Sequence, residues 1–200
     1  MITSLQQLDF SKQYTYADYL KWQFQERVEL LRGWILPMAA PNVVHQTIST
    51  NLNGILWSYL KRNPCQLFAA PFDVRLPLPQ KKVKGDKIDT VVQPDLCVVC
   101  DASKLDLQGC VGAPDLVVEI LSPGNSKKEM RDKYELYEEA GVLEYWIVDP
   151  SHRSVLIYAL QDGKFVNNSR PLTDEDVLTS SVFTDLQIDL AEIFPEEEEN

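Results

Sequence analysis

The sequence predicts a single-domain α/β (α+β) fold in which helices flank a mixed β-sheet. Its length of 200 residues and its hydrophobic fraction of 44% suit one domain with a sizeable core. Apolar patterns along the chain follow the order helix, hairpin, helix, several strands, helix and strands. Neither an internal repeat nor an interdomain linker interrupts this order. We therefore expect one domain over residues 10–195 and a disordered acidic tail over residues 196–200.

The first part of the chain predicts two helices and a hairpin. They are a short helix from residue 15 to about residue 25, a hairpin of residues 28–31 and 34–38, and a helix of about residues 42–61. Thr15 and Asp18 have the spacing of a capping box, which favours a helix start. Gly33 lies in the expected hairpin turn, and Pro64 ends the long helix.

The second part of the chain predicts strands around a single helix. Strands are expected at 66–70, 72–76, 91–100, 116–121, 144–148, 154–160 and 164–166, a polar turn at 79–87, an irregular segment at 101–113 and a helix at about 126–140. Pro94 interrupts the third of these strands, and Gly141 is suited to end the helix. The unit from Leu116 to Val148 should form a right-handed parallel crossover.

The charge of the chain limits its partners. A formal net charge of -11 and a pI of about 4.6 oppose indiscriminate binding to nucleic acid, because phosphate contacts require clustered Lys and Arg. Residues 1–10 lack a signal-peptide pattern, and no apolar run is long enough to span a bilayer. These observations predict a soluble cytoplasmic protein without a membrane partner.

The four cysteines are expected to be reduced in a cytoplasmic chain. Cys97 and Cys100 form a C-x-x-C pattern, but an offset of three places them on opposite faces of the expected strand. The remaining cysteines, Cys65 and Cys110, do not form the second C-x-x-C that a structural zinc site needs. Packing in the core is therefore favoured, and a zinc protein is the weakest alternative.

A buried charge pair is predicted by the surroundings of Lys133. The same arc of its helix holds Met130, Leu136, Tyr137 and Ala140. Glu119, fourteen residues earlier, lies in an otherwise apolar strand. A cation and a carboxylate directed at the core are costly unless they meet or share a ligand. We expect Lys133 and Glu119 to form part of an active site, or else a buried structural ion pair.

A second acid completes a candidate metal site. Asp95 follows Pro94 and precedes an apolar strand, so its carboxylate and that of Glu119 can lie at neighbouring strand ends. Two such carboxylates can bind one divalent ion and leave positions open for water and substrate. Lys133 could orient the attacking water or stabilise the transition state. Asp115, the other acid in a Pro-Asp dipeptide, is expected to cap the strand that holds Glu119.

These residues resemble the PD-(D/E)xK nuclease signature. In that pattern the lysine follows the glutamate by two residues, whereas this chain has Leu121 there, and Lys133 is the natural substitute. Three longer runs resemble the Uma-two family of endonucleases, which is abundant in cyanobacteria: residues 112–124, 131–137 and 140–149. The resemblance implies a restriction-endonuclease-like fold, nuclease activity and a divalent metal, Mg²⁺ or Mn²⁺, bound by Asp95 and Glu119.

The resemblance also adds two supporting residues. Glu29 is similar to a glutamate before the first hairpin turn of that family, and His45 to a histidine at the start of its long helix. A basic cluster in the expected polar turn could contact a nucleic-acid backbone, or could be a solvated turn. It consists of Lys81, Lys82, Lys84 and Lys87.

We therefore predict a Mg²⁺-dependent endonuclease that acts on nucleic acid, with DNA as the expected substrate. Asp95, Glu119 and Lys133 are the predicted catalytic residues, supported by Glu29 and His45. A homodimer is expected, because twofold symmetry suits cleavage of both strands of a duplex. The alternative is a non-catalytic nucleic-acid-binding or regulatory module that retains the nuclease fold.

Overall fold

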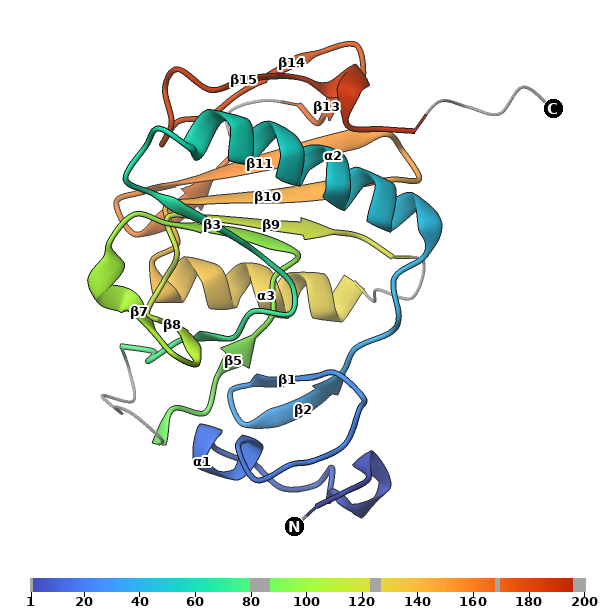
Figure 1. Cartoon of the computed structure of the whole chain (residues 1–200), viewed down its shortest axis with the longest axis vertical. Helices are drawn as coiled ribbons and strands as arrows, with labels where there is room; N and C mark the ends of the chain where they lie inside the picture. Colours follow the sequence, from blue (N-terminus) through green and yellow to red (C-terminus); the bar gives the residue numbers. More distant parts are fainter. Residues whose placement is uncertain (1, 80–86, 123–126, 168–169, 196–200) are drawn as a thin grey trace, which may run out of the picture.

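Two large β-sheets organise the computed structural model, which describes residues 2–79, 87–122, 127–167 and 170–195 (Figure 1). The predicted acidic tail and Lys81, Lys82 and Lys84 lie outside the described residues. The larger sheet has seven strands, ordered β12-β11-β10-β9-β6-β3, with β13 also paired to β11. These strands are β3 (Gln66–Ala69), β6 (Leu96–Val99), β9 (Leu116–Ile120), β10 (Glu144–Asp149), β11 (Ser154–Gln161), β12 (Lys164–Val166) and β13 (Leu172–Thr173).

The larger sheet is mixed, as predicted. Strands β9 and β10 are parallel, and their connection runs through helix α3 (Lys127–Ala140), whereas β9 pairs antiparallel with β6. Gly141 follows α3 with a φ of 87°, the left-handed conformation that glycine adopts readily at a helix end. The expected α/β fold with a mixed sheet and few helices is therefore confirmed.

A second sheet of six strands lies beside the first, in the order β2-β1-β5-β4-β8-β7. Its strands are β1 (Val28–Leu31), β2 (Trp34–Pro37), β4 (Val74–Arg75), β5 (Val91–Val92), β7 (Leu105–Asp106) and β8 (Gly109–Val111). The strand expected over residues 91–100 is interrupted at Pro94, as predicted, but its two parts belong to different sheets. The chain leaves the second sheet after β5 and enters the first at β6, on either side of Pro94, which lacks the N–H that a continuous ladder requires.

Two expectations were wrong. Residues 101–113 are not irregular, because they contain β7 and β8, and β8 pairs with β4 from a distant part of the chain. The first helix, α1 (Tyr16–Tyr19), does not continue to residue 25. Its predicted capping box at Thr15 and Asp18 is present, but Gln23 donates a backbone hydrogen bond of 2.7 Å to Ile2 O and so leaves the helical path.

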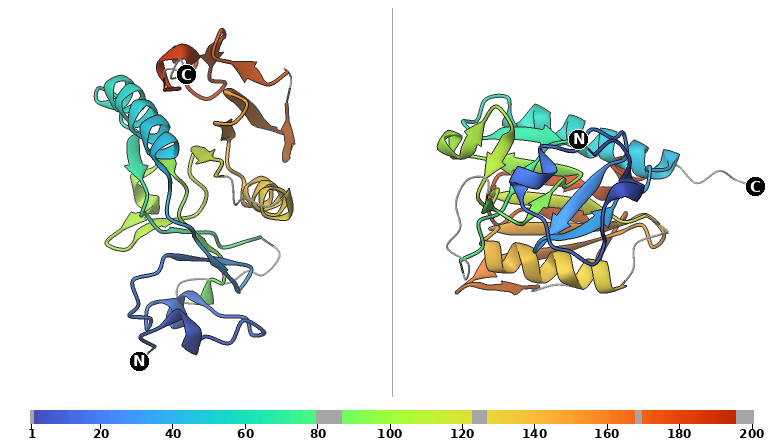
Figure 2. Two further views of the ribbon diagram at one scale, coloured as in Figure 1. Left: turned by 90° about the vertical axis from the view of Figure 1, so that its right-hand side faces the viewer. Right: turned by 90° about the horizontal axis from the view of Figure 1, so that it is seen from below.

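Helix α2 (Val43–Leu60) and helix α3 cover opposite faces of the larger sheet (Figure 2). The side chain of Asn42 caps α2, and buried residues at a spacing of four follow: Ile48, Leu52, Leu56 and Leu60. They pack with Leu116 and Val118 of β9, while Val117 of the same strand packs with α3. By this alternation Glu119 faces α3.

The first and the last elements of the described residues lie at opposite ends of the molecule. Helix α1, β1 and β2 lie at one end, and the hairpin of β14 (Val177–Thr179) and β15 (Gln187–Asp189) lies at the other (Figures 1 and 2). Short 3₁₀ helices occur at Leu5–Gln7, Ala102–Lys104 and Leu190–Glu192. Within the described ranges, no helix has the length and apolarity needed to cross a membrane.

The expectation that all four cysteines are reduced was also wrong. Cys65 and Cys100 form a disulfide that joins the start of β3 to the end of β6. The register pairs Gln66 with Val99, so the next positions outward, Cys65 and Cys100, are cross-strand neighbours. Cys97 and Cys110 are free and buried, in agreement with core packing. The pairing follows from tertiary register, because 35 residues separate the two cysteines.

Reduction of this disulfide should lower the stability of the folded chain. Closing a loop of 35 residues is worth roughly 4 kcal/mol in the chain-entropy description. We expect dithiothreitol to lower the urea midpoint of the wild type, and to leave that of the Cys65→Ser/Cys100→Ser double variant unchanged. Equal midpoints for the wild type with and without reductant would contradict the expectation.

Candidate active site

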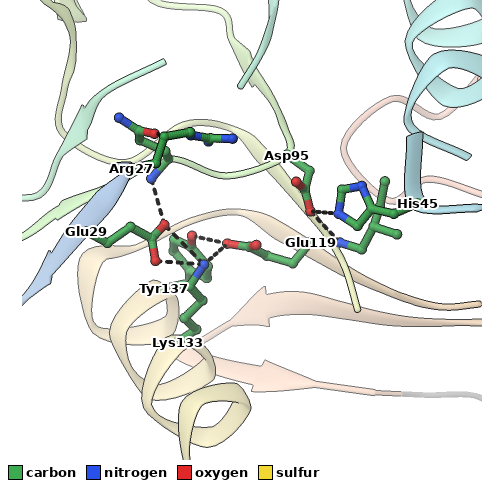
Figure 3. Close-up of polar contacts among 9 residues, drawn as sticks. Arg27, Glu29, His45, Asp95, Glu119, Lys133 and Tyr137 are labelled. Atoms are coloured by element: carbon green, nitrogen blue, oxygen red, sulfur yellow. Dashed lines mark hydrogen bonds and ion pairs between the residues drawn. The ribbon is translucent and has the colours of Figure 1, made fainter. Parts of the chain in front are cut away.

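The predicted acids and lysine line one cavity of about 150 Å³ between the two sheets and helix α3. Its charged and titratable lining groups are Arg27, Glu29, Glu119, Glu129, Lys133, His45, Asp95 and Tyr145. These groups come from both sheets and from both long helices. Helix α3 and its neighbouring strands β9 and β10 supply four of them, and the others lie in or next to β1, in the first turn of α2 and immediately before β6. Figure 3 shows that Glu29, Glu119 and Lys133 converge although they lie far apart in the sequence.

Asp95 and Glu119 are neighbours across two antiparallel strands. The register pairs Leu96 with Val118, so the next positions outward are Asp95 and Glu119. Directly opposed residues in an antiparallel pair have Cβ atoms about 5 Å apart. Asp95 Oδ2 accepts a hydrogen bond of 2.8 Å from the backbone N–H of Ile120, which fixes the carboxylate beside Glu119.

Lys133 lies between two buried carboxylates. Its Nζ atom is 2.9 Å from Glu119 Oε1 and 3.1 Å from each carboxylate oxygen of Glu29. The Lys133 side chain is 8% exposed and that of Glu29 is 1% exposed, so little water screens these contacts. The buried ion pair expected from the sequence is therefore present, and its residues also line the cavity, whereas a catalytic role for them stays a prediction.

Two groups that sequence reasoning missed hold the acids in place. Tyr137 donates a hydrogen bond of 2.6 Å from its hydroxyl to Glu119 Oε1, and the backbone N–H of Gln93 donates one of 2.8 Å to Glu29 Oε1. Tyr137 was expected only as a core residue. Its position one helical turn after Lys133, on the same face of α3, was a usable signal.

His45 lies against Asp95 rather than against the lysine. Its Nε2 atom is 3.3 Å from Asp95 Oδ2, and its side chain is 9% exposed. Burial lowers the pKa of His45, but the hydrogen bond and negative charge of Asp95 outweigh this and raise the pKa above the usual 6.5. The helix cap at Asn42, which accepts a hydrogen bond from the backbone N–H of His45, sets the position of this residue in α2.

Burial and neighbouring charges shift the two central groups. Burial raises the pKa of the Glu119 carboxyl to about 7; the Lys133 ammonium opposes this rise, and the Asp95 and Glu29 carboxylates reinforce it. Burial alone would lower the pKa of Lys133, but Glu119 and Glu29 outweigh it and hold the pKa above 10.5. Lys133 is therefore a cation at neutral pH, and it cannot accept a proton there.

The donor set at Asp95 and Glu119 fits a divalent ion that keeps several waters. One oxygen of each carboxylate, Asp95 Oδ1 and Glu119 Oε2, accepts no hydrogen bond from the residues that the structure describes. Mg²⁺ is commonly held by one or two carboxylates together with water and substrate phosphates. The described residues contain no cluster of three or more His, Cys, Asp or Glu placed to bind a metal. Among the described residues, Asp95 and Glu119 are thus the two side chains of this cavity that could bind a divalent ion.

The remaining candidates lie elsewhere. Asp115 accepts a hydrogen bond of 2.7 Å from the backbone N–H of Cys100, at the opposite end of β9 from Glu119. This contact agrees with the expected capping role. Lys87, the described member of the basic cluster, is exposed and does not line the cavity.

Comparisons with known proteins show which family this chain resembles. The profile of the Uma2 family, described as "Putative restriction endonuclease", matches residues 16–191. Two uncharacterized proteins of Synechocystis sp. are 24% and 26% identical to this chain, over 72% and 68% of its length and 73% and 74% of theirs.

A solved structure shares the fold. It is described as a putative nuclease belonging to DUF820 from Anabaena variabilis, and it matches with a TM-score of 0.68 at 19% identity. The match covers 90% of this chain and 97% of that chain. At this level of identity the likeness establishes the architecture alone.

Removal of the buried cation should destabilise the chain strongly. In Lys133→Met, Glu29 and Glu119 lose the ammonium that they share, so we expect the free energy of unfolding to fall by about 3–5 kcal/mol in urea titrations. Lys164→Met is the matched control, because Lys164 pairs with Glu138 at 2.7 Å but is 76% exposed. Its loss should lower the free energy of unfolding far less, because solvent screens this exposed pair. Similar costs for both variants would contradict the assignment.

The raised pKa of Glu119 predicts a pH dependence of stability in metal-free buffer. The folded chain binds this proton more tightly than the unfolded chain, whose carboxyl has a pKa near 4.5. The contribution of Glu119 is therefore complete below pH 4.5 and is lost as the pH rises to about 7. Relative to Glu119→Gln, the wild type should lose unfolding free energy as the pH rises across this interval. Parallel pH profiles for the two proteins would refute this.

Proposed function

Because this chain belongs to the Uma2 family, we propose that it is a metal-dependent endonuclease that hydrolyses phosphodiester bonds in DNA. The observation that carries the proposal is the cavity in which Asp95 and Glu119 lie opposite each other and Lys133 lies 2.9 Å from Glu119. Opposed carboxylates with a nearby cation are the groups that metal-assisted hydrolysis of a phosphodiester requires.

Asp95 and Glu119 are the residues that would hold the ion. Bound Mg²⁺ or Mn²⁺ would supply an activated water and neutralise charge that develops on the phosphoryl group. The Ile120 N–H and the His45 ring keep Asp95 Oδ2 in place, which leaves the other oxygen of Asp95 for the ion. Tyr137 does the same for Glu119 through Oε1.

Lys133 acts as a fixed cation in this proposal. Since Glu29 and Glu119 keep it protonated, it donates hydrogen bonds and cannot serve as the general base. From its position beside Glu119 it can orient the attacking water or stabilise negative charge in the transition state. Glu29 is a positioning residue, because it holds the ammonium at the cavity wall from the second sheet.

The second candidate function is a non-catalytic nucleic-acid-binding or regulatory module. The net charge of -11 favours the regulatory form of this module over an enzyme that acts on nucleic acid, because such a charge opposes the approach of a polyanion. The contact of Lys133 with Glu119 favours it too, because an ammonium there can replace a metal ion. Isothermal titration with Mn²⁺ separates the two functions, since an absence of binding at millimolar metal supports the module. A twofold dimer, expected if the protein cuts both strands of a duplex, remains a prediction.

Substitution of Asp95 should abolish cleavage, whereas substitution of the other Pro-Asp acid should not. We expect Asp95→Asn to reduce Mg²⁺- or Mn²⁺-dependent cleavage of plasmid DNA at least about 10³-fold and to weaken Mn²⁺ binding, because it removes a ligand charge. Asp115→Asn is the matched control, since its carboxylate contacts Cys100 N at the far end of β9.

Cleavage assays should include single-stranded DNA and RNA. The proposed activity is wrong if the wild type cuts none of these substrates with either metal. The assignment of Asp95 is wrong if its variant cuts as fast as Asp115→Asn.

A further inference from the structure

Arg27 lines the same cavity as the acids and Lys133. It lies immediately before β1, two residues from Glu29. Its Nε atom donates a hydrogen bond of 3.0 Å to Gln93 Oε1. Its Nη2 atom is buried and has no hydrogen-bond partner among the described residues. A charged donor that is buried and unpaired is costly, so such a group indicates an absent partner.

The charges of the cavity indicate that this partner is an anion. Lys133 is already paired with two carboxylates, those of Glu29 and Glu119. Among the described residues that line the cavity, Arg27 is then the cation without a carboxylate partner within salt-bridge distance. An anionic substrate that approaches these acids needs such a group, and the planar guanidinium is suited to the oxygens of a phosphate.

We propose that Arg27 binds a non-bridging oxygen of a nucleic-acid phosphate next to the bond that is cut. This inference rests on the proposed function, because it takes the phosphodiester substrate from it. Arg27 contacts the phosphate with its guanidinium while Nε remains bonded to Gln93. Figure 3 shows Arg27 beside Glu29, at the edge of the cluster of acids.

Gln93 fixes the direction of the guanidinium. Its side-chain Nε2 donates hydrogen bonds to Asp73 Oδ1 at 2.8 Å and to the Tyr19 hydroxyl at 3.1 Å. These acceptors determine which end of the amide faces them, so the carbonyl oxygen faces Arg27. The backbone N–H of Gln93 also holds Glu29. Gln93 is therefore a positioning residue for the cation that binds phosphate and for the acid that holds Lys133.

The test measures binding separately from cleavage. A fluorescently labelled DNA duplex of 20 base pairs is titrated with the full-length protein in Ca²⁺, and anisotropy is read at several salt concentrations. The variants are Arg27→Met, Arg27→Lys and the control Arg62→Met. The control has the same charge change, but Arg62 follows the C-terminal end of α2. His45 lies in the first turn of this helix of 18 residues, which is about 27 Å long.

For Arg27→Met we expect affinity to fall about 10-fold and the salt slope to fall by about 0.9, because one phosphate contact is lost. Arg27→Lys keeps the charge but loses the Gln93 contact, so its affinity should be intermediate. Arg62→Met should bind as the wild type does. Thermal unfolding of each variant shows whether it is folded. If Arg27→Met does not fold, the affinity of Arg27→Lys still tests the role of the guanidinium.

Two results overturn the inference. The first is that Arg27→Met binds DNA with the same affinity and the same salt slope as Arg62→Met. The second is that the wild type binds neither this duplex nor the matching single strand. Failure of the proposed hydrolysis looks different. In that case the wild type binds the duplex through Arg27 but does not cut it with Mg²⁺ or Mn²⁺.

Discussion

The site depends on one constraint, which is that the ammonium of Lys133 is buried and must be neutralised. A buried ion pair is tolerated only when both partners and their remaining hydrogen bonds are supplied. Here Glu119 comes from the larger sheet, Glu29 from the second sheet and Lys133 from α3, so one cation ties three elements together. Tyr137 and the Gln93 N–H complete the hydrogen bonds of the two acids. The geometry of the cavity follows from this requirement.

Three consecutive residues connect this cation to the candidate metal site. Gln93 follows the last residue of β5 in the second sheet, Pro94 interrupts the strand, and Asp95 comes immediately before β6 of the first sheet. The break allows Gln93 to contact Glu29 while Asp95 reaches the position opposite Glu119. A continuous strand would have kept all three residues in one ladder. The Pro-Asp dipeptide is therefore important for the path of the backbone as well as for its carboxylate.

Prediction from the sequence succeeded where a local pattern carries the information. The apolar stripes of α2 and α3, the capping box at Thr15 and the apolar strand around Glu119 are all visible within a few residues, and the buried side of Lys133 could be read from its helix. Glu29 and His45 were reached through family resemblance, and the structure brings both to the cavity. Strands β7 and β8 and the disulfide between Cys65 and Cys100 could not be read this way, because each depends on a partner strand far along the chain.

The sequence by itself determined that two charged groups are buried, a cation on an apolar helix face and a carboxylate in an apolar strand, and that an acid follows a strand-breaking proline. Only the tertiary structure decided how these charges are shared. It gives Lys133 a second acid, places Tyr137 on Glu119 and leaves the Arg27 guanidinium with a buried donor that has no partner in the described chain. The physical reason is that burial follows from local periodicity, whereas charge neutralisation depends on the distances between elements that only the packed sheets and helices define.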